Sequence, residues 1–223
     1  MDNHSNLDIY YQNVRSLCSK TDLCLNLSAI KDFDTIILTE TWLSSSILDN
    51  ELFDESYQVQ RHDRDFNAAG RSRGGGVLLA AHSSLSVVPV DVSLTAAVSP
   101  LLNILACKCR LSFQSVIIII AIYISPDLHV SLFEECLNTL EDIVQGTKVV
   151  FAGDFNIPHL VNDHVTDSKS DIFRDFCHIT NLTQYNKIFN RSGRFLDLVI
   201  SNLSPQVSHS DDPYFSEELL SSA

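Results

Sequence analysis

The sequence predicts one layered α/β domain, in which helices pack on a large β-sheet or on a pair of sheets. Short runs rich in Val, Ile, Leu and Tyr, bounded by turn residues, recur along the chain as strands do. Amphipathic, helix-like segments lie between some of them. No Pro- or Ser-rich linker and no internal repeat divides the 223 residues. Since 45% of the residues are hydrophobic and 19% are charged, the chain can bury a sizeable core.

Nine segments are predicted to be strands. In chain order they cover residues 7–14, 35–42, 57–64, 74–81, 85–92, 102–109, 115–125, 148–156 and 195–201. The runs 35–38 and 116–124 are apolar without interruption, a pattern typical of strands covered on both faces. We therefore expect these two runs to form central strands.

Three segments have the pattern of helices. The clearest spans residues 129–145, where apolar side chains recur at helical spacing and acidic residues occupy the other side. A shorter helix is predicted over 170–180, with Ser170 or Asp171 as its N-cap. A third, over 21–33, connects the first two predicted strands.

The six cysteines indicate a reducing environment more than a disulfide or zinc framework. None lies in a CxxC motif, and Cys107 and Cys109 lie two apart on one face of a predicted strand. The first ten residues contain no apolar signal-peptide segment. The longest apolar run, residues 116–124, is far too short to cross a bilayer. We expect buried free thiols in a soluble, intracellular domain that does not involve a membrane.

Polar side chains lie at or near the ends of five apolar strands. They are Asn13, Glu40, Tyr123, Asp154 and Asp197. In layered α/β proteins, ligands meet loops at strand ends. Each residue alone has an ordinary explanation, such as an Asx-turn, a solvated loop carboxylate or a core tyrosine with a satisfied hydroxyl.

Together, three of these residues favour a metal site. Glu40, Asp154 and Asp197 supply hard oxygen ligands, and no lysine lies close to them in the sequence. Carboxylates that converge repel one another unless a divalent cation lies among them. Mg²⁺, or Mn²⁺ in its place, prefers such ligands.

Six motifs carry a resemblance to a known family. In chain order they are QNVRSL, LTETWL, RGGGVLLA, IYISP, FAGDFNIP and FLDLVISN. The sequence resembles the endonuclease/exonuclease/phosphatase superfamily. More closely, it is similar to the apurinic-type endonuclease domain of jockey-like non-LTR retrotransposons. The similarity covers about residues 7–213, which we take as the domain.

The resemblance implies a four-layer α/β sandwich, with two packed mixed sheets between outer helices. It also implies a hydrolase that uses Mg²⁺ (or Mn²⁺) to nick double-stranded DNA, leaving a 3′-hydroxyl that primes reverse transcription. A reverse transcriptase domain is then expected in the full-length element. A nuclear location is likewise implied by the resemblance alone.

Three positions match residues that hold the metal and the phosphate in this family. Glu40 matches its metal ligand, and Asn13 matches the asparagine that helps to hold the metal site. Tyr123 matches the tyrosine that reaches the scissile phosphate. The chemistry supports such roles, because phosphodiester cleavage needs charge neutralisation at the phosphoryl oxygens and help for the leaving alkoxide.

Three more positions match residues that act on the attacking water and its surroundings. Asp154 matches the aspartate that orients or deprotonates the water, and Asn156 matches its partner on the phosphate. A carboxylate beside an amide can hold a nucleophile in line. Asp197 matches the carboxylate that orients a catalytic histidine.

The histidine itself has no match. The family pattern is followed up to about Pro213, and residues 214–223 form a divergent, polar tail that we expect to be disordered. His209 and Asp211 precede the expected pair and lie in an unpatterned stretch. We therefore expect a C-terminally truncated domain that lacks its last strand and has weak or no nuclease activity.

The charge of the chain fits nucleic acid poorly, with one local exception. A net charge of −13 argues against a protein that depends on phosphate contacts. Arg61, Arg64, Arg71 and Arg73 nevertheless surround or precede a run of three glycines. They form either a loop that grips DNA phosphates or a solvated polar loop. The glycines lack the GxxxxGK[ST] pattern of a nucleotide-binding loop.

Two other functions stay open at this point. One is a phosphatase or phosphodiesterase of the same superfamily that acts on lipid or inositol phosphates. The other is a non-catalytic remnant that serves as an interaction surface. The LTETWL and LDLVISN motifs favour the nuclease.

Overall fold

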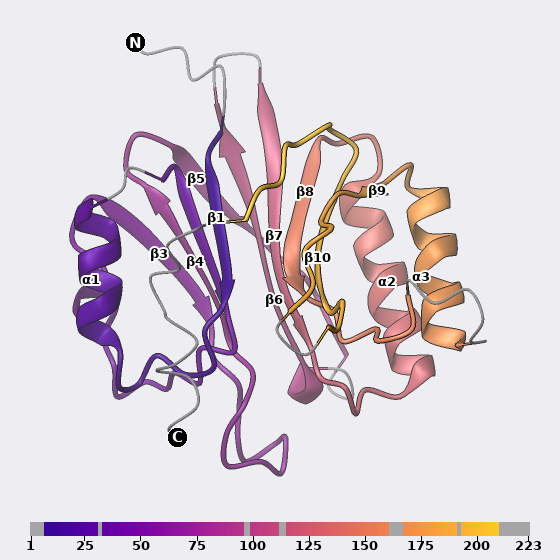
Figure 1. The fold of residues 1–223 in the computed structure, drawn as a ribbon, viewed down its shortest axis with the longest axis horizontal. Coiled ribbons are helices and arrows are strands. Elements are labelled where there is room, and N and C mark those ends of the chain that lie inside the picture. The colour runs from indigo at the N-terminus through magenta and orange to yellow at the C-terminus, as the bar shows by residue number, and fades with distance from the viewer. Residues whose placement is uncertain are drawn as a thin grey trace.

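The computed structural model describes residues 7–30, 33–95, 99–111, 115–160, 167–190 and 193–209. Two β-sheets face each other, with one helix outside the first sheet and two helices outside the second (Figure 1). This arrangement confirms the predicted four-layer α/β sandwich. The calls on residues 210–223, including Asp211, lie outside the described residues.

The first sheet has four strands in the order β1-β2-β4-β3. Their bounds are β1 (Ile9–Asn13), β2 (Thr35–Thr39), β3 (Tyr57–His62) and β4 (Val77–His82). Strand β1 pairs with β2 in parallel, and the other two pairs are antiparallel. Helix α1 (Thr21–Ile30) makes the crossover from β1 to β2 and lies on the outer face of this sheet (Figure 1).

The second sheet has six strands in the order β5-β6-β7-β8-β10-β9. Their bounds are β5 (Ser86–Val90), β6 (Leu102–Arg110), β7 (Val116–Ile124), β8 (Val149–Asp154), β9 (Thr183–Gln184) and β10 (Asp197–Ser201). Helices α2 (Val130–Val144) and α3 (Ser168–Ile179) cover its outer face (Figure 1). Two 3₁₀ turns complete the set, η1 (Asp49–Glu51) and η2 (Ser99–Leu101). The two-residue strand β9 was not predicted.

The two uninterrupted apolar runs are central strands, as predicted. Strand β7 shows why both of its faces are apolar. Ile118, Ile120 and Ile122 pack toward α2 and α3, in the layer that also contains Phe133. Residues at alternating positions, among them Tyr123, pack between the two sheets. The Tyr123 side chain therefore lies in the layer between the two sheets.

The N-cap of α3 differs from the prediction. The helix begins at Ser168, so the cap is Asp167, whose Oδ2 accepts from the Ser170 backbone N–H at 3.2 Å. The Ser170 hydroxyl donates to the same oxygen at 2.6 Å. The assignment to Ser170 or Asp171 was wrong because three more polar residues precede Ser170, and the first of them, Asp167, has the cap geometry.

The cysteines are all free thiols in the structure. Four are buried, Cys177 is half-buried and Cys18 is exposed, so the predicted burial holds for most of them. Burial raises the pKa of the Cys109 thiol to about 12, which keeps it protonated and unreactive. Of the helices described, none is long and apolar enough to cross a membrane.

Gly153, at the end of the β8 run, is required by strand packing. A Cβ at this position would lie 2.0 Å from the carbonyl oxygen of Ile122, the residue opposite it on β7. Real Cβ atoms do not approach a backbone oxygen so closely, and β7 and β8 are both central strands that cannot move apart easily. The glycine of the GDFN motif therefore permits the close pairing that places Asp154.

Replacing this glycine tests that constraint. We expect Gly153→Ala to lower the free energy of unfolding in urea by about 3 kcal/mol or more, the upper range for overpacking. The matched control is Gly146→Ala, because a Cβ there meets open space and only the φ of +69° is unfavourable. The control should lose about 1 kcal/mol. Equal losses in both variants would contradict the packing argument.

Candidate active site

Strand register aligns polar residues across the second sheet. On β6, β7, β8 and β10, Asn103 lies opposite Tyr123, Tyr123 opposite Asp154, and Asp154 opposite Asp197. These pairs lie at the end of the sheet where β7 and β8 end and β10 begins. We call this row of strand ends the edge of the second sheet. The strand register brings these side chains together, because they occupy paired positions on neighbouring strands.

The first sheet reaches this row through two side chains of β1. Asn13 ends the strand, and its Nδ2 donates to Asp154 Oδ2 at 3.0 Å. The Tyr11 hydroxyl donates to Asp197 Oδ1 and lies 3.1 Å from Thr39 Oγ1. Residues two apart on a strand share a face, so both side chains cross the gap between the sheets together. Each catalytic carboxylate predicted on the second sheet thus has a hydrogen bond from the first.

Glu40 follows β2 and is held by two donors. Its Oε2 accepts from the indole Nε1 of Trp42 and from the backbone N–H of Gly75, the latter at 3.0 Å. Glu40 and Trp42 both have φ of +56°, a left-handed conformation that is unfavourable for such residues. Backbone strain of this kind is concentrated at functional sites, where the surroundings fix it.

The glycine run fills a space that side chains could not occupy. Gly75 accepts from the Trp42 backbone N–H at 3.0 Å, and the Gly76 N–H donates to Asn103 Oδ1 at 2.9 Å. A Cβ on Gly76 would lie 2.4 Å from Thr41 Oγ1. The run therefore connects the end of β2 to the second sheet by backbone contacts alone.

Burial and neighbouring negative charge dominate the electrostatics of the site. Burial raises the pKa of Asp154 well above its usual value, and the charges of Asp197 and Glu40 raise it further, against the bonds from Asn156 and Asn13. Burial also raises the pKa of Asp197. The pKa of Tyr123 is raised by burial, by the charge of Glu40 and by its hydrogen bond to Glu40. A cation at this edge would relieve all three shifts.

The donors present fit a magnesium-type ion. Asn13 Oδ1 is buried and has no hydrogen-bond partner in the part of the chain that the structure describes. Glu40 supplies a carboxylate beside it, across the paired ends of β1 and β2. Mg²⁺ is usually held by one or two protein oxygens, with water and phosphate completing its shell. Within the described ranges no three His, Cys, Asp or Glu residues form a metal cluster.

Asn156 forms a tight turn after β8. Its backbone N–H donates to Asp154 Oδ1 at 3.1 Å, and its own φ is +49°. Its Nδ2 donates to the carbonyl of Ile124 at 2.8 Å, which ties the turn to the end of β7. The Asx-turn and the site are therefore the same feature, since the turn orients the Asp154 carboxylate.

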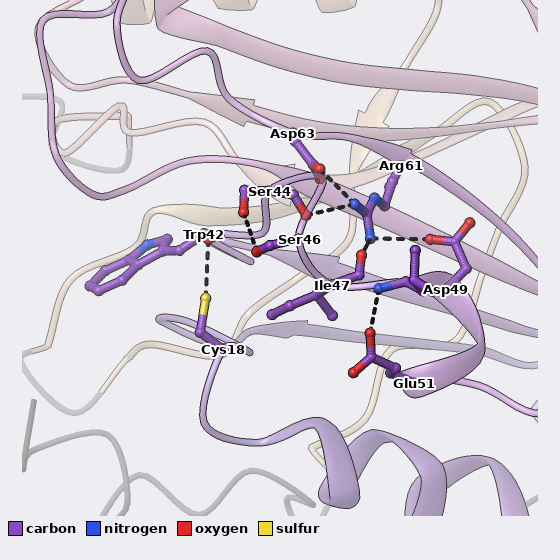
Figure 2. A network of polar contacts seen from close by, with 10 residues as sticks. Cys18, Trp42, Ser44, Ser46, Ile47, Asp49, Glu51, Arg61 and Asp63 are labelled. Atoms are coloured by element: carbon purple, nitrogen blue, oxygen red, sulfur yellow. Dashed lines mark hydrogen bonds and ion pairs between the residues drawn. The ribbon is translucent and has the colours of Figure 1, made fainter.

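The structure does not bring the four arginines together on one exposed loop. Arg61 is 15% exposed and lies among Asp49, Asp63 and the carbonyls of Ser44 and Ile47 (Figure 2). Its N–H groups bond to these partners at 2.7–3.1 Å. Arg61 therefore fixes the loop between β2 and β3.

The other three arginines belong to the loop between β3 and β4, which projects beyond the strand ends (Figure 1). Arg64 is buried, with its guanidinium 4.9 Å from the Tyr123 ring centroid. Arg71 is exposed and pairs with Asp127. Arg73 is exposed and lies 6.0 Å from the ring of Trp42.

Sequence reasoning missed three residues of the site. Tyr11 and Asn103 lie within strands, where they alternate with apolar neighbours. That alternation does not indicate a site until the register of the sheets is known. Trp42 is the only tryptophan of the chain and follows Glu40 by two residues. His209 is exposed, and among the described residues the side chain that bonds Asp197 is Tyr11.

Comparisons with known proteins agree with this fold. Residues 117–221 match a family model described as endonuclease-reverse transcriptase. The endonuclease domain of TRAS1, a telomere-specific non-LTR retrotransposon, superposes with a TM-score of 0.63 at 14% identity, covering 88% of this chain and 85% of that one. No curated protein matches the chain in sequence.

The chain has the fold of the endonuclease/exonuclease/phosphatase superfamily. Two more solved structures share this superfamily fold. The 3′ phosphatase NExo from Neisseria, bound to a product DNA hairpin, has a TM-score of 0.62 at 17% identity, with 88% and 86% of the two chains covered. The AP endonuclease LMAP from Leishmania major has a TM-score of 0.58 at 13% identity, with 87% and 78% covered. At these identities, the structures show the fold of this chain and not its substrate.

The raised pKa of Asp154 predicts a pH dependence of stability. In the folded state the carboxyl group keeps its proton to higher pH than in the unfolded chain, so ionisation destabilises the fold as pH rises. The free energy of unfolding of Asp154→Asn, relative to wild type without metal, should therefore shift in favour of the variant between about pH 4 and pH 8. A difference that stays constant over this range would contradict the assignment.

Trp42 predicts an optical signal for metal binding. Because its indole donates to Glu40 and it is the only tryptophan, its fluorescence should change when Mg²⁺ binds. In Glu40→Gln the midpoint of a Mg²⁺ titration should rise at least about tenfold. The matched control is Glu51→Gln, on the 3₁₀ turn η1, which should titrate like wild type. The same midpoint in Glu40→Gln and wild type would exclude Glu40 as a ligand.

Proposed function

We propose that the chain is a Mg²⁺- or Mn²⁺-dependent DNA endonuclease domain of a jockey-like non-LTR retrotransposon, which nicks target DNA to prime reverse transcription. The observation that carries the proposal is the convergence of Asn13, Tyr123, Asp154 and Asp197 at one edge, beside Glu40. The superfamily hydrolyses phosphate esters, and the match to an endonuclease-reverse transcriptase family supports DNA as the substrate.

Asp154 is the proposed general base. It is 6% exposed, and the bonds from Asn13 and the Asn156 backbone fix both of its oxygens. Burial and the charges of Asp197 and Glu40 raise the pKa of Asp154, which makes its carboxylate a stronger base toward water. A water that donates to Asp154 would be held for attack on a phosphorus atom at this edge.

Glu40 and Asn13 would hold the metal ion. When bound, the ion supplies positive charge to the phosphoryl oxygens and to the leaving 3′-side oxygen. The protein's part is to fix the two ligands: Trp42 and Gly75 hold one oxygen of Glu40, and the Asn13 amide is oriented by Asp154. Ligands fixed in this way need no rearrangement when the substrate arrives.

Tyr123 would donate its hydroxyl to the scissile phosphate. Its raised pKa keeps the proton on the hydroxyl, which is the state needed for a donor. The amide of Asn156 lies on the adjacent turn, where it holds the end of β7. Asp197 receives a hydrogen bond from Tyr11 in place of the histidine that the family pattern implies. For this reason we expect slow hydrolysis by the 223-residue chain.

DNA would lie against the loop between β3 and β4. Arg71 and Arg73 are exposed there, and we assign them to contacts with DNA phosphates. Because the chain as a whole carries a charge of −13, binding should depend on these few cations and fall steeply with salt. The expected partners are double-stranded DNA and, in the full-length element, a reverse transcriptase domain, with action in the nucleus.

The test is nicking of supercoiled plasmid by the purified chain. We expect slow nicking that requires Mg²⁺ or Mn²⁺ and leaves ends that a DNA polymerase can extend. Asp154→Asn should reduce the rate by about a hundredfold or more while the protein remains folded. Asp175→Asn, on the exposed side of α3, is the matched control and should nick like wild type.

Two outcomes would redirect the proposal. Release of a 3′-terminal phosphate without nicking, or hydrolysis of inositol phosphates in place of DNA, would identify a phosphatase or phosphodiesterase. If Asp154→Asn nicks plasmid as fast as wild type, the nicking comes from a contaminating enzyme.

A further inference from the structure

Arg64 is enclosed at the candidate site. It follows β3 by two residues, and only 6% of it is exposed. Its guanidinium lies 4.9 Å from the centroid of the Tyr123 ring. A Cβ on Gly75 would lie 2.3 Å from the central carbon of the guanidinium. The group therefore fills the space between the glycine backbone and the aromatic ring, and only glycine at position 75 leaves room for it.

Two of the three guanidinium nitrogens of Arg64 lack hydrogen-bond partners among the described residues. Its Nε and Nη2 are buried, and neither has a partner among the residues that the structure describes. Arg61, three residues earlier, has two carboxylates and two carbonyls around it. Arg64 therefore leaves N–H groups of two buried guanidinium nitrogens without acceptors. Such a group destabilises the fold unless a negative group approaches it.

The surroundings of Arg64 indicate where that negative group would lie. A Cβ on Gly74 would lie 3.6 Å from Arg64 Nη1 and 3.8 Å from Glu40 Oε2. The guanidinium and the carboxylate of the proposed metal ligand therefore both lie close to this glycine. Tyr123, on which Arg64 stacks, is opposite Asp154 in the sheet. The positive charge is therefore directed at the edge where the proposed function places a phosphate.

We propose that Arg64 is a positioning residue that supplies a fixed positive charge to a phosphate-binding site and holds the Tyr123 ring beneath it. This inference rests on the proposed hydrolysis of a phosphodiester. The ring stacking sets the direction of the Tyr123 hydroxyl, and the charge attracts the phosphate group without direct contact. The glycine run has no nucleotide-binding pattern, but it leaves room for the Arg64 guanidinium beside the backbone that holds Glu40.

The experiment measures binding of inorganic phosphate to the intact chain by calorimetry, in the presence of Mg²⁺. Wild type should bind phosphate, and Arg64→Met should bind it at least about tenfold more weakly, because the charge is lost. Arg64→Lys should keep most of the phosphate affinity but lose kcat in plasmid nicking by about tenfold, with KM for DNA unchanged, because an ammonium does not stack as a plane. A merely structural role would not separate kcat from phosphate affinity in this way.

The matched control is Arg110→Met, an exposed arginine at the opposite end of β6 from Asn103, which should bind phosphate like wild type. Thermal unfolding of each variant identifies loss of fold, and Arg64→Lys keeps the test decisive if Arg64→Met does not fold. Equal phosphate affinity in wild type and both Arg64 variants would overturn the inference, as would no phosphate binding by wild type. Phosphate binding that depends on Arg64, in a chain that never nicks DNA, would support the inference and refute the proposed nuclease.

Discussion

The docking of two sheets around buried carboxylates is the interaction on which the rest of the structure depends. Asp154 and Asp197 lie at the edge of the second sheet, but the side chains that bond them, Asn13 and Tyr11, come from the first. A buried carboxylate without partners would be too unfavourable to keep in place. The same two bonds therefore stabilise the pairing of the sheets and set the direction of the carboxylates. A shift of β1 by one residue would turn both donors away.

The loop elements serve the same docking. The glycine run carries backbone donors to Glu40 on one side and to Asn103 on the other, so it joins the end of β2 to the second sheet. Trp42 and Glu40 adopt left-handed backbone conformations that the tight passage requires. The negative charge gathered there is offset in part by Arg64, which contacts Tyr123 and whose Nε and Nη2 have no hydrogen-bond partner among the described residues. Left-handed backbone and buried carboxylates thus meet at this edge, while apolar clusters pack in the three layers around it.

Much of this was predictable from the sequence, for physical reasons that differ between elements. Strands such as β7 and helices such as α2 follow from hydrophobic periodicity, because their packing uses whole faces. Asp154 and Glu40 could be found because polar residues directly after apolar strands are conspicuous. Strand β9 could not, since two residues carry no period. The cap at Asp167 was missed because several polar residues compete at a helix start.

The partners of the site residues were harder to predict than the residues themselves. Tyr11 looks like any strand tyrosine until the register between two sheets is known. The burial of Arg64 depends on a glycine eleven residues later, a contact that no local pattern indicates. Both are contacts between distant chain segments, and they could not be predicted from one sequence without its fold.

The division of the chain between the two sheets has a consequence for how activity can be lost. Among the described residues, the strands of the first sheet come from residues 9–82 and those of the second from residues 86–201. Neither half contains both a carboxylate row and the ligands that face it. The site is therefore an interface between two halves of the chain, like the interface between two subunits. Substitutions that loosen the packing of the sheets anywhere along this interface would affect the reaction without changing a site residue.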